Sequence, residues 1–220
     1  GAFVYRVCLR RSLGGPELVR ISEGVRQDRL SWSAILDLSA FILMVTIMGA
    51  ALATASSFLT LYMVDILGAS ERTAAALLAL YFSGGIWAAP LGGCLADRFG
   101  RKRVAVAAAF AAVAGLLILP RVSYGFGFFA LLVILGAVPY VRMPAAEAYI
   151  VGRVPERLRS TVLGIYFFAG MEGSGVLTPL LGRWIDLHGF QAGFSTLGYA
   201  MGTVVGICAL VLAVGRRKKV

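Results

Sequence analysis

Residues 90–103 read Pro-Leu-Gly-Gly-Cys-Leu-Ala-Asp-Arg-Phe-Gly-Arg-Lys-Arg, and they place the densest group of charges in the chain on a short turn. A long apolar stretch precedes this turn at 73–95, and another follows it at 104–120. Charges concentrated between two apolar stretches are typical of a loop in water that joins two membrane-embedded helices.

The composition supports a membrane location for the whole chain. Of its 220 residues, 59% are hydrophobic and 15% are charged, and the mean hydropathy is +0.84. A single soluble core would not bury so much apolar surface. Stretches near the ~20 residues that cross a ~30 Å hydrocarbon core occur at 34–64, 73–95, 104–120, 126–150, 161–181 and 191–214.

These six stretches lack the two-residue alternation of outer-membrane strands, so the predicted fold class is an all-α membrane protein with six transmembrane helices. We expect a cytoplasmic linker at 1–32, the transmembrane domain at 33–215 and a basic cytoplasmic tail at 216–220. The chain starts with Gly1 instead of Met and shows no signal-peptide pattern. We therefore expect it to be a fragment that begins inside a linker.

The net charge of +10 orients the predicted bundle. Of the 21 Lys and Arg residues, 17 fall on one side of a six-helix topology, three fall on the other side, and Arg142 lies inside a helix. The positive-inside rule then places both termini in the cytoplasm, with the basic side against anionic lipid headgroups. This pattern argues against nucleic-acid binding, and the short loops suit a bacterial inner membrane.

One pattern of the charged turn occurs twice. The sequence P-L-x-G-x-x-x-D-x-x-G is found at 90–100 and again at 179–189. The first copy ends the second predicted helix on the basic side, and the second copy ends the fifth helix on the other side. Two three-helix units in inverted topology predict this arrangement, although five matching positions in a Gly-rich chain can also arise by chance.

The turn has the spacing G-x-x-x-D-R-x-G-R-K, formed by Gly93, Asp97, Arg98, Gly100, Arg101 and Lys102. It resembles a cytoplasmic loop of major facilitator superfamily transporters. Residues 155–164 resemble the P-E-x-x-R-[GS]-x-x-x-G entry to the fifth helix of a facilitator half. The resemblance implies one six-helix half of a twelve-helix transporter, and it favours the C-terminal half. The expected partner is the other half or a second copy of this chain.

We expect the turn to act in gating. Gly93 would let two helices approach closely, and Asp97 would accept hydrogen bonds from amides at a helix N-terminus. The basic residues would pair with acids on an adjacent helix. A solvated loop that only sets topology is the alternative. At the start of the fifth helix, Ser160 or Thr161 would provide a cap.

Arg142 and Glu172 are the deepest ionisable residues and the main candidates for binding a substrate or a proton. They lie eight and twelve residues, or ~12 and ~18 Å, from the cytoplasmic helix ends. Buried charges in membranes are expensive unless they are paired or face water. Arg142 would anchor an anionic substrate or Glu172, and Glu172 would bind a proton. A permanent structural ion pair between them is the alternative.

Two further candidates have weaker support. Glu147, like Asp37, lies close enough to the cytoplasmic boundary to pair with arginines of the loops. Tyr140 would shape a pocket, although aromatic residues in membrane helices usually serve packing. The segments 104–120 and 191–214 carry almost no charge and are expected to be outer, lipid-facing helices.

The predicted function is secondary transport of a small solute by alternating access, coupled to protons if Glu172 titrates. A degenerate half that acts in membrane assembly or sensing is the alternative. The three cysteines are far apart and His188 is the lone histidine, so no metal or cofactor is expected. No cluster of nucleophiles or paired acids indicates an enzyme.

Overall fold

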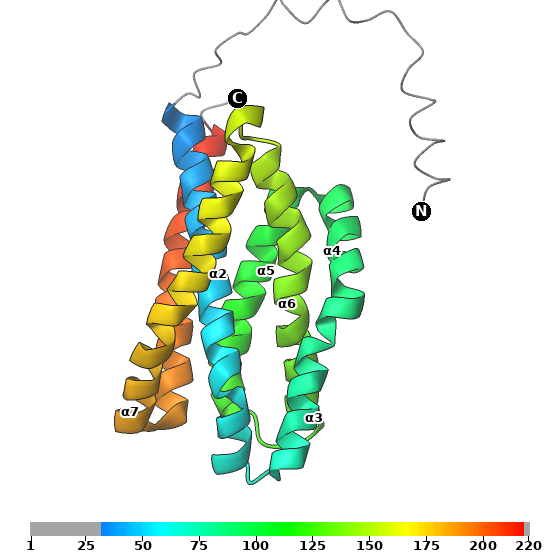
Figure 1. The fold of residues 1–220 in the computed structure, drawn as a ribbon, viewed down its shortest axis with the longest axis vertical. Helices are drawn as coiled ribbons and strands as arrows, with labels where there is room; N and C mark the ends of the chain where they lie inside the picture. Colours follow the sequence, from blue (N-terminus) through cyan, green and yellow to red (C-terminus); the bar gives the residue numbers. More distant parts are fainter. Residues whose placement is uncertain (1–31, 218–220) are drawn as a thin grey trace, which may run out of the picture. The chain divides into compact units, whose positions relative to one another are not determined.

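The computed structural model describes residues 32–217, so the predicted linker, apart from Trp32, and most of the predicted tail lie outside the described residues. Helices account for nearly all of this region (Figure 1). The α-helices are α2 (Trp32–Asp65), α3 (Glu71–Phe82), α4 (Gly84–Phe99), α5 (Arg101–Ile118), α6 (Phe126–Val151) and α7 (Arg159–Arg217), and short 3₁₀ turns are η1 (Leu119–Arg121) and η2 (Glu156–Leu158).

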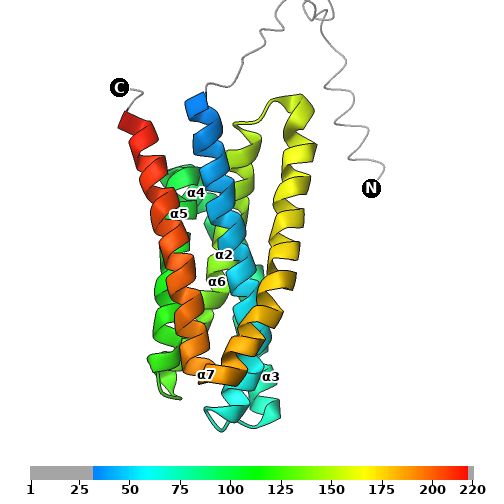
Figure 2. The same cartoon turned by 90° about the vertical axis from the view of Figure 1, so that its left-hand side faces the viewer.

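Five helical segments are long and apolar enough to cross a membrane. They are Ala34–Asp65, Glu71–Phe99, Arg101–Arg121, Phe126–Val151 and Glu156–Ala213. The all-helical fold class is therefore confirmed, and the described residues contain no strand. The two last predicted segments, 161–181 and 191–214, both fall within α7, which has a non-helical residue at Gly189. Figure 2 shows the chain reversing there, so that α7 has two arms.

The second predicted segment is interrupted at Ser83, where α3 gives way to α4. The backbone amide of Ile86 donates to the carbonyl of Ser83 at 3.0 Å, a three-residue step instead of the four-residue step of an α-helix. The Ser83 hydroxyl donates to the carbonyl of Leu80 at 2.6 Å. These hydrogen bonds give the carbonyls of Ser83 and Leu80 partners beside the break.

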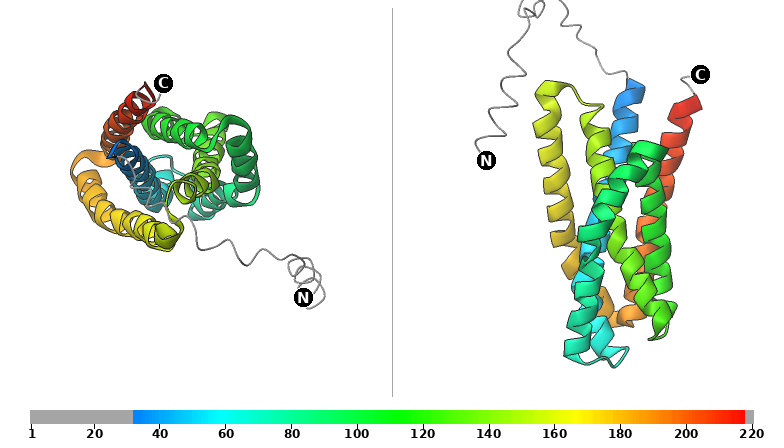
Figure 3. Two further views of the ribbon diagram at one scale, coloured as in Figure 1. Left: turned by 90° about the horizontal axis from the view of Figure 1, so that it is seen from above. Right: turned by 90° about the vertical axis from the view of Figure 1, so that its right-hand side faces the viewer.

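The connections alternate between two ends of the helical region (Figures 2 and 3). The start of α2, the α4–α5 corner, the α6–α7 turn and the end of α7 share one end, which we call the basic end. The α2–α3 turn, the α5–α6 turn and the reversal between the two arms of α7 lie at the opposite end. Arginines and lysines of the charged turn and of 153–159 gather at the basic end, so the predicted charge asymmetry exists in space among the described residues.

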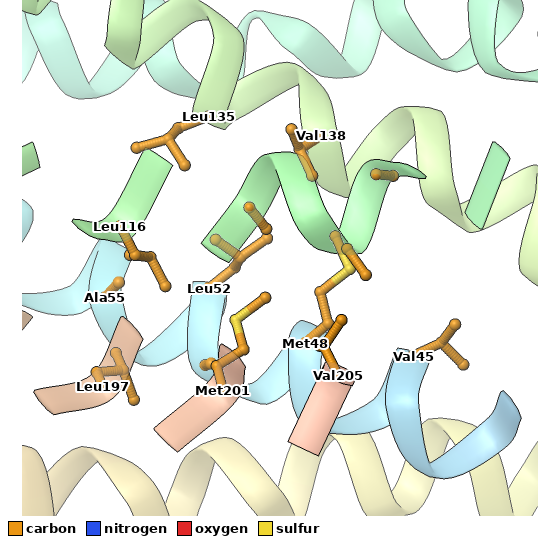
Figure 4. Close-up of a cluster of buried hydrophobic side chains, with 14 of the residues drawn as sticks. Val45, Met48, Leu52, Ala55, Leu116, Leu135, Val138, Leu197, Met201 and Val205 are labelled. Atoms are coloured by element: carbon orange, nitrogen blue, oxygen red, sulfur yellow. The ribbon is translucent and has the colours of Figure 1, made fainter. Parts of the chain in front are cut away.

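The interior of the helical region is apolar (Figure 4). α2 packs against both arms of α7: Gly173 of the first arm approaches Ala50, and the ring of Tyr62 meets that of Phe194 of the second arm at 5.4 Å. The labelled side chains of Figure 4 come from α2, α5, α6 and α7. They are Val45, Met48, Leu52, Ala55, Leu116, Leu135, Val138, Leu197, Met201 and Val205.

The outer surface is also apolar, as a helix in lipid requires. Ile86 is 84% exposed and Phe126 is 87% exposed, and many other large apolar side chains point outward. Such a surface would aggregate in water, whereas lipid solvates it. Helix association in lipid then depends on close packing more than on burial of apolar area. α5 follows this rule, because it buries a face of small residues that includes Ala105, Ala109 and Ala112.

Four small residues at a spacing of four, Gly84, Ala88, Gly92 and Ala96, are all buried on one face of α4. We call them the small-residue seam. A Cβ atom on Gly92 would lie 2.5 Å from the carbonyl oxygen of Val141 on α6. The backbones of α4 and α6 are therefore in direct contact. The close approach expected at Gly93 is not formed within the described chain, because a Cβ on Gly93 would meet no atom there within 4 Å.

Two glycines make the tight reversals at the ends of the repeated pattern. Gly100 has φ 93° and ψ 133°, and Gly189 has φ 83° and ψ 166°. Both conformations lie in the region that side chains with a Cβ rarely adopt. The amide of Gly100 donates to the carbonyl of Ala96 at 3.0 Å, so α4 ends and α5 begins across a single residue. The last glycine of the pattern thus has a similar conformation in both copies.

Candidate functional site

A cavity of about 400 Å³ lies between α2, α6 and the first arm of α7. It is lined by Val45, Thr46, Gly49, Ala53, Arg142, Met143, Tyr166, Phe167, Gly170, Met171 and Ser174. Most of these residues are apolar, and the polar groups are few. Small-molecule sites commonly have this character, with apolar walls for contact and a few polar groups that fix orientation.

Arg142 is the charged residue of this cavity, and its exposed fraction is only 8%. Its Nη1 donates to the backbone oxygen of Val45 on α2 at 2.8 Å and to the hydroxyl of Tyr166 on α7 at 2.9 Å. An ideal Cβ on Gly49 would lie 3.3 Å from Nη2, so this glycine makes room for the guanidinium. The arginine therefore joins three helices beside the cavity.

No carboxylate forms an ion pair with Arg142 among the described residues, although Glu147, five residues further along α6, lies near enough to interact with its charge. The ion pairs in this region are Lys102–Asp37 and Arg159–Glu156, and neither involves Arg142. The Nε of Arg142 and the Oγ1 of Thr46 are both buried without a hydrogen-bond partner in the described chain. A buried cation whose direct hydrogen-bond partners are all neutral keeps a large part of its desolvation penalty. This arrangement favours an anion beside it.

The other deep candidates do not join Arg142. Glu172 is exposed on α7 and does not line the cavity, so the predicted contact between Glu172 and Arg142 is not formed. Glu147 is half-buried, and its Oε1 has no hydrogen-bond partner in the described region. The expected pairing of Glu147 with a loop arginine is thus absent. Tyr140 instead packs toward α4, where a Cβ on Gly85 would lie 3.2 Å from its ring.

The charged turn makes specific contacts at the basic end. Nζ of Lys102 lies 3.1 and 3.3 Å from the two carboxylate oxygens of Asp37 on α2, and it donates to the carbonyl of Leu212 on α7 at 3.2 Å. Each side chain of the ion pair is only 15% exposed. Nη1 of Arg101 donates to the carbonyl of Ala148 on α6 at 3.0 Å. The prediction that basic residues of the turn pair with an acid on another helix is confirmed for Lys102.

Other expectations for the turn and for the α7 entry are not met in this conformation. Asp97 is exposed, and its side chain makes no hydrogen bond within the described chain. The guanidinium of Arg98 instead lies 5.5 Å from the centre of the ring of Phe99. α7 begins at Arg159, so Ser160 lies within its first turn, and no side-chain cap forms there in the described residues. The Arg159–Glu156 ion pair at 3.3 Å occupies this entry instead.

Because the Lys102–Asp37 pair is largely buried, we expect it to stabilise this conformation measurably. In a double-mutant cycle with Asp37→Asn and Lys102→Gln, the free energy of unfolding should show a coupling of about 0.5–3 kcal/mol. The measurement is reversible unfolding in mixed detergent micelles. Asp37→Asn combined with Arg98→Gln is the matched control and should be additive. A coupling of zero between Asp37 and Lys102 would show that their ion pair does not stabilise this conformation.

Sequence reasoning missed two features of the site. The small-residue seam had a readable signal, because its glycines and alanines recur every four residues. Tyr166 could be named from the sequence as an aromatic residue that shapes a pocket, but its hydrogen bond with Arg142 had no such signal. The two residues are 24 positions apart on different helices, and only the packing of α6 against α7 brings them together.

Comparison with protein families adds an independent finding. The family model of the Major Facilitator Superfamily matches residues 40–220. The matched region includes most of α2, the charged turn, the small-residue seam and all the residues that line the cavity beside Arg142.

Proposed function

Because this chain belongs to the Major Facilitator Superfamily, whose members carry solutes across membranes and are typically not enzymes, we propose that it forms part of a secondary transporter for a small anionic solute. Its family and its apolar helices make it an integral, multi-pass membrane protein. Transport by alternating access requires a solute site near the middle of the membrane. The cavity beside Arg142 supplies that site in our proposal.

One observation carries the choice of an anionic solute. Arg142 is buried beside a 400 Å³ cavity, and the described residues offer it neutral hydrogen-bond acceptors but no carboxylate within ion-pair distance. Removing a cation from water has a penalty of several kcal/mol, and a paired anion offsets much of it. The planar guanidinium also matches the two oxygens of a carboxylate or phosphate. A bound anionic solute would therefore stabilise the Arg142 site, and its release would remove this stabilisation.

We further propose that the chain is one six-helix half, counting the two arms of α7 as separate crossings. The similar corners at Gly100 and Gly189, which lie at opposite ends of the helical region, support two three-helix units in inverted topology. Six helices do not enclose a pathway with two gates, so a second six-helix unit is needed. The entry motif at 155–164 favours the C-terminal half, with the basic end in the cytoplasm.

The proposal is tested by uptake into proteoliposomes with the intact protein encoded by the gene. The probes are matched pairs of small solutes, each a carboxylic acid with its amide, together with inorganic phosphate and sulfate. We expect saturable uptake of one or more anions and no uptake of the paired amide. Residues 1–220 alone should not transport. Saturable uptake that is confined to neutral or cationic solutes would contradict the anionic substrate.

Glu172 is our candidate for coupling to protons, since an ionisable residue within a membrane helix often belongs to an ion pathway. In the same liposomes, an imposed proton gradient should accelerate uptake by the wild-type protein, and Glu172→Gln should remove this acceleration. The control is Glu156→Gln, because Glu156 is exposed in η2, just before α7. An unchanged response to the gradient in Glu172→Gln would exclude Glu172 as the proton carrier and leave the anion site untouched.

A further inference from the structure

Two apolar grooves flank α5 at the basic end, apart from the cavity beside Arg142. The first has a volume of about 580 Å³ and lies between α4, α5 and α6, with Trp87 and Phe99 in its wall. The second has a volume of about 490 Å³ and lies between α5 and the second arm of α7, with Leu212 in its wall. Arg103 and Ala107 of α5 line both grooves. The two grooves therefore meet at these residues.

The dimensions of the first groove suit a lipid chain. Its wall on α4 runs from Phe99 to Trp87, twelve residues or ~18 Å along the helix. One leaflet of a bilayer contributes half of a ~30 Å hydrocarbon core, or ~15 Å. Its wall on α5 includes Ala107, Ala108 and Ala111, whose short side chains leave the space open. Arg103 lies at the basic end of this groove, where α5 begins.

Arg103 is a cation without a partner in the described chain. It is exposed and makes no hydrogen bond or ion pair there, whereas its neighbour Lys102 is neutralised by Asp37. Arg98, Arg101 and Arg153 lie around the adjoining pocket, in which Asp97 is the acidic residue. The rim of the grooves is therefore strongly positive. Basic clusters at the cytoplasmic ends of membrane helices attract anionic headgroups.

We propose that this site binds one anionic phospholipid, with the phosphate on Arg103 and one acyl chain in each groove. The lipid would straddle α5 at Ala107, since a phospholipid has two chains and the grooves diverge from one cation. The site is separate from the solute cavity, because neither groove includes Arg142. It adjoins the contact between α4 and α6, because Val141, which Gly92 abuts, also lines the first groove.

Quenching of Trp87 fluorescence by brominated lipid tests the proposal, because Trp87 lies in the wall of the first groove. The intact protein carrying Trp32→Phe and Trp184→Phe, with any tryptophans outside residues 1–220 also replaced, is reconstituted in phosphatidylcholine vesicles that contain a minor fraction of phosphatidylglycerol. Bromine is placed either on the phosphatidylglycerol or on an equal fraction of the phosphatidylcholine. We expect severalfold stronger quenching by the brominated phosphatidylglycerol. Equal quenching by the two lipids would overturn the proposal.

Three variants locate the site. Arg103→Gln should remove the preference for phosphatidylglycerol, whereas Arg98→Gln, an exposed arginine of the same turn that lines neither groove, should retain it. Ala107→Leu should weaken quenching by filling the junction of the grooves, and Ala107 is exposed, so the fold should tolerate leucine. If Arg98→Gln reduces the preference as much as Arg103→Gln, the attraction is diffuse and the Arg103 site is wrong. Size-exclusion profiles establish that each variant is folded.

Discussion

Arg142→Gln is expected to lower kcat/KM for uptake of the anionic solute by roughly 30- to 4000-fold, because removing one partner of a buried, hydrogen-bonded charge pair costs about 2–5 kcal/mol. Glutamine can donate hydrogen bonds, but it has no charge to attract the solute. Arg142→Lys keeps the charge and loses the planar fork, so it should recover only part of the activity. The measurement is initial uptake into proteoliposomes over a range of solute concentrations.

The Arg142 variants must be distinguished from a simple loss of folding, because Arg142 also joins α2 and α7 through Val45 and Tyr166. Tyr166→Phe removes one acceptor and keeps the cation. It should lower the thermal unfolding temperature slightly while the preference for an acid over its amide persists. Arg183→Gln, an exposed arginine of α7, is the matched control and should leave uptake unchanged. Normal uptake of the acid by a folded Arg142→Gln protein would mean that Arg142 is only structural.

Gly92→Val is expected to prevent stable folding, whereas the adjacent Gly93→Ala should be neutral or stabilising. Any Cβ on Gly92 would lie 2.5 Å from the carbonyl oxygen of Val141, and this neighbour is backbone, which cannot rotate away. Overpacking of this kind typically costs 1–3 kcal/mol even for small additions, and valine adds two more methyl groups. At Gly93 a Cβ would meet open space, and alanine favours a helix over glycine by up to ~1 kcal/mol.

The contrast is measured as the thermal unfolding temperature and the folded yield in detergent. Gly92→Ala gives an intermediate case, and it should destabilise where Gly93→Ala does not. The pair is informative because the family pattern includes Gly93 and not Gly92. Equal behaviour of the two alanine variants would show that α4 does not contact α6 in the way described. A severe defect in Gly93→Ala transport with normal stability would assign Gly93 to contacts outside this chain.

Much of the fold could be predicted because membrane helices must satisfy their backbone within one continuous apolar segment. This constraint defined the segments at 34–64 and 126–150 to within one residue of the candidate spans. The two reversals of the chain were also open to prediction, because glycine is the residue that readily adopts the conformations of Gly100 and Gly189. The break at Ser83 was not predictable from hydropathy, because both sides of it are equally apolar and remain helical.

The site was harder to predict because contacts depend on the rotation of each helix about its axis. Neighbouring residues point about 100° apart, so Gly92 faces α6 while Gly93 does not, although both are glycines of one motif. The same geometry explains Glu172. The sequence predicts its depth along α7 but not its direction: Glu172 is exposed, whereas Met171 and Ser174 face the cavity. Depth follows from sequence, and direction follows from packing.

The single residue between α4 and α5 has a mechanical consequence. Phe99 and Arg101 are joined only through Gly100, so their Cα atoms can separate by no more than about 7 Å. Because the connection is one residue long, a tilt of α4 must also move the first turn of α5. Lys102 lies in that first turn and holds Asp37 and the end of α7. A rocking motion of α4 would therefore displace Lys102 and strain its ion pair with Asp37.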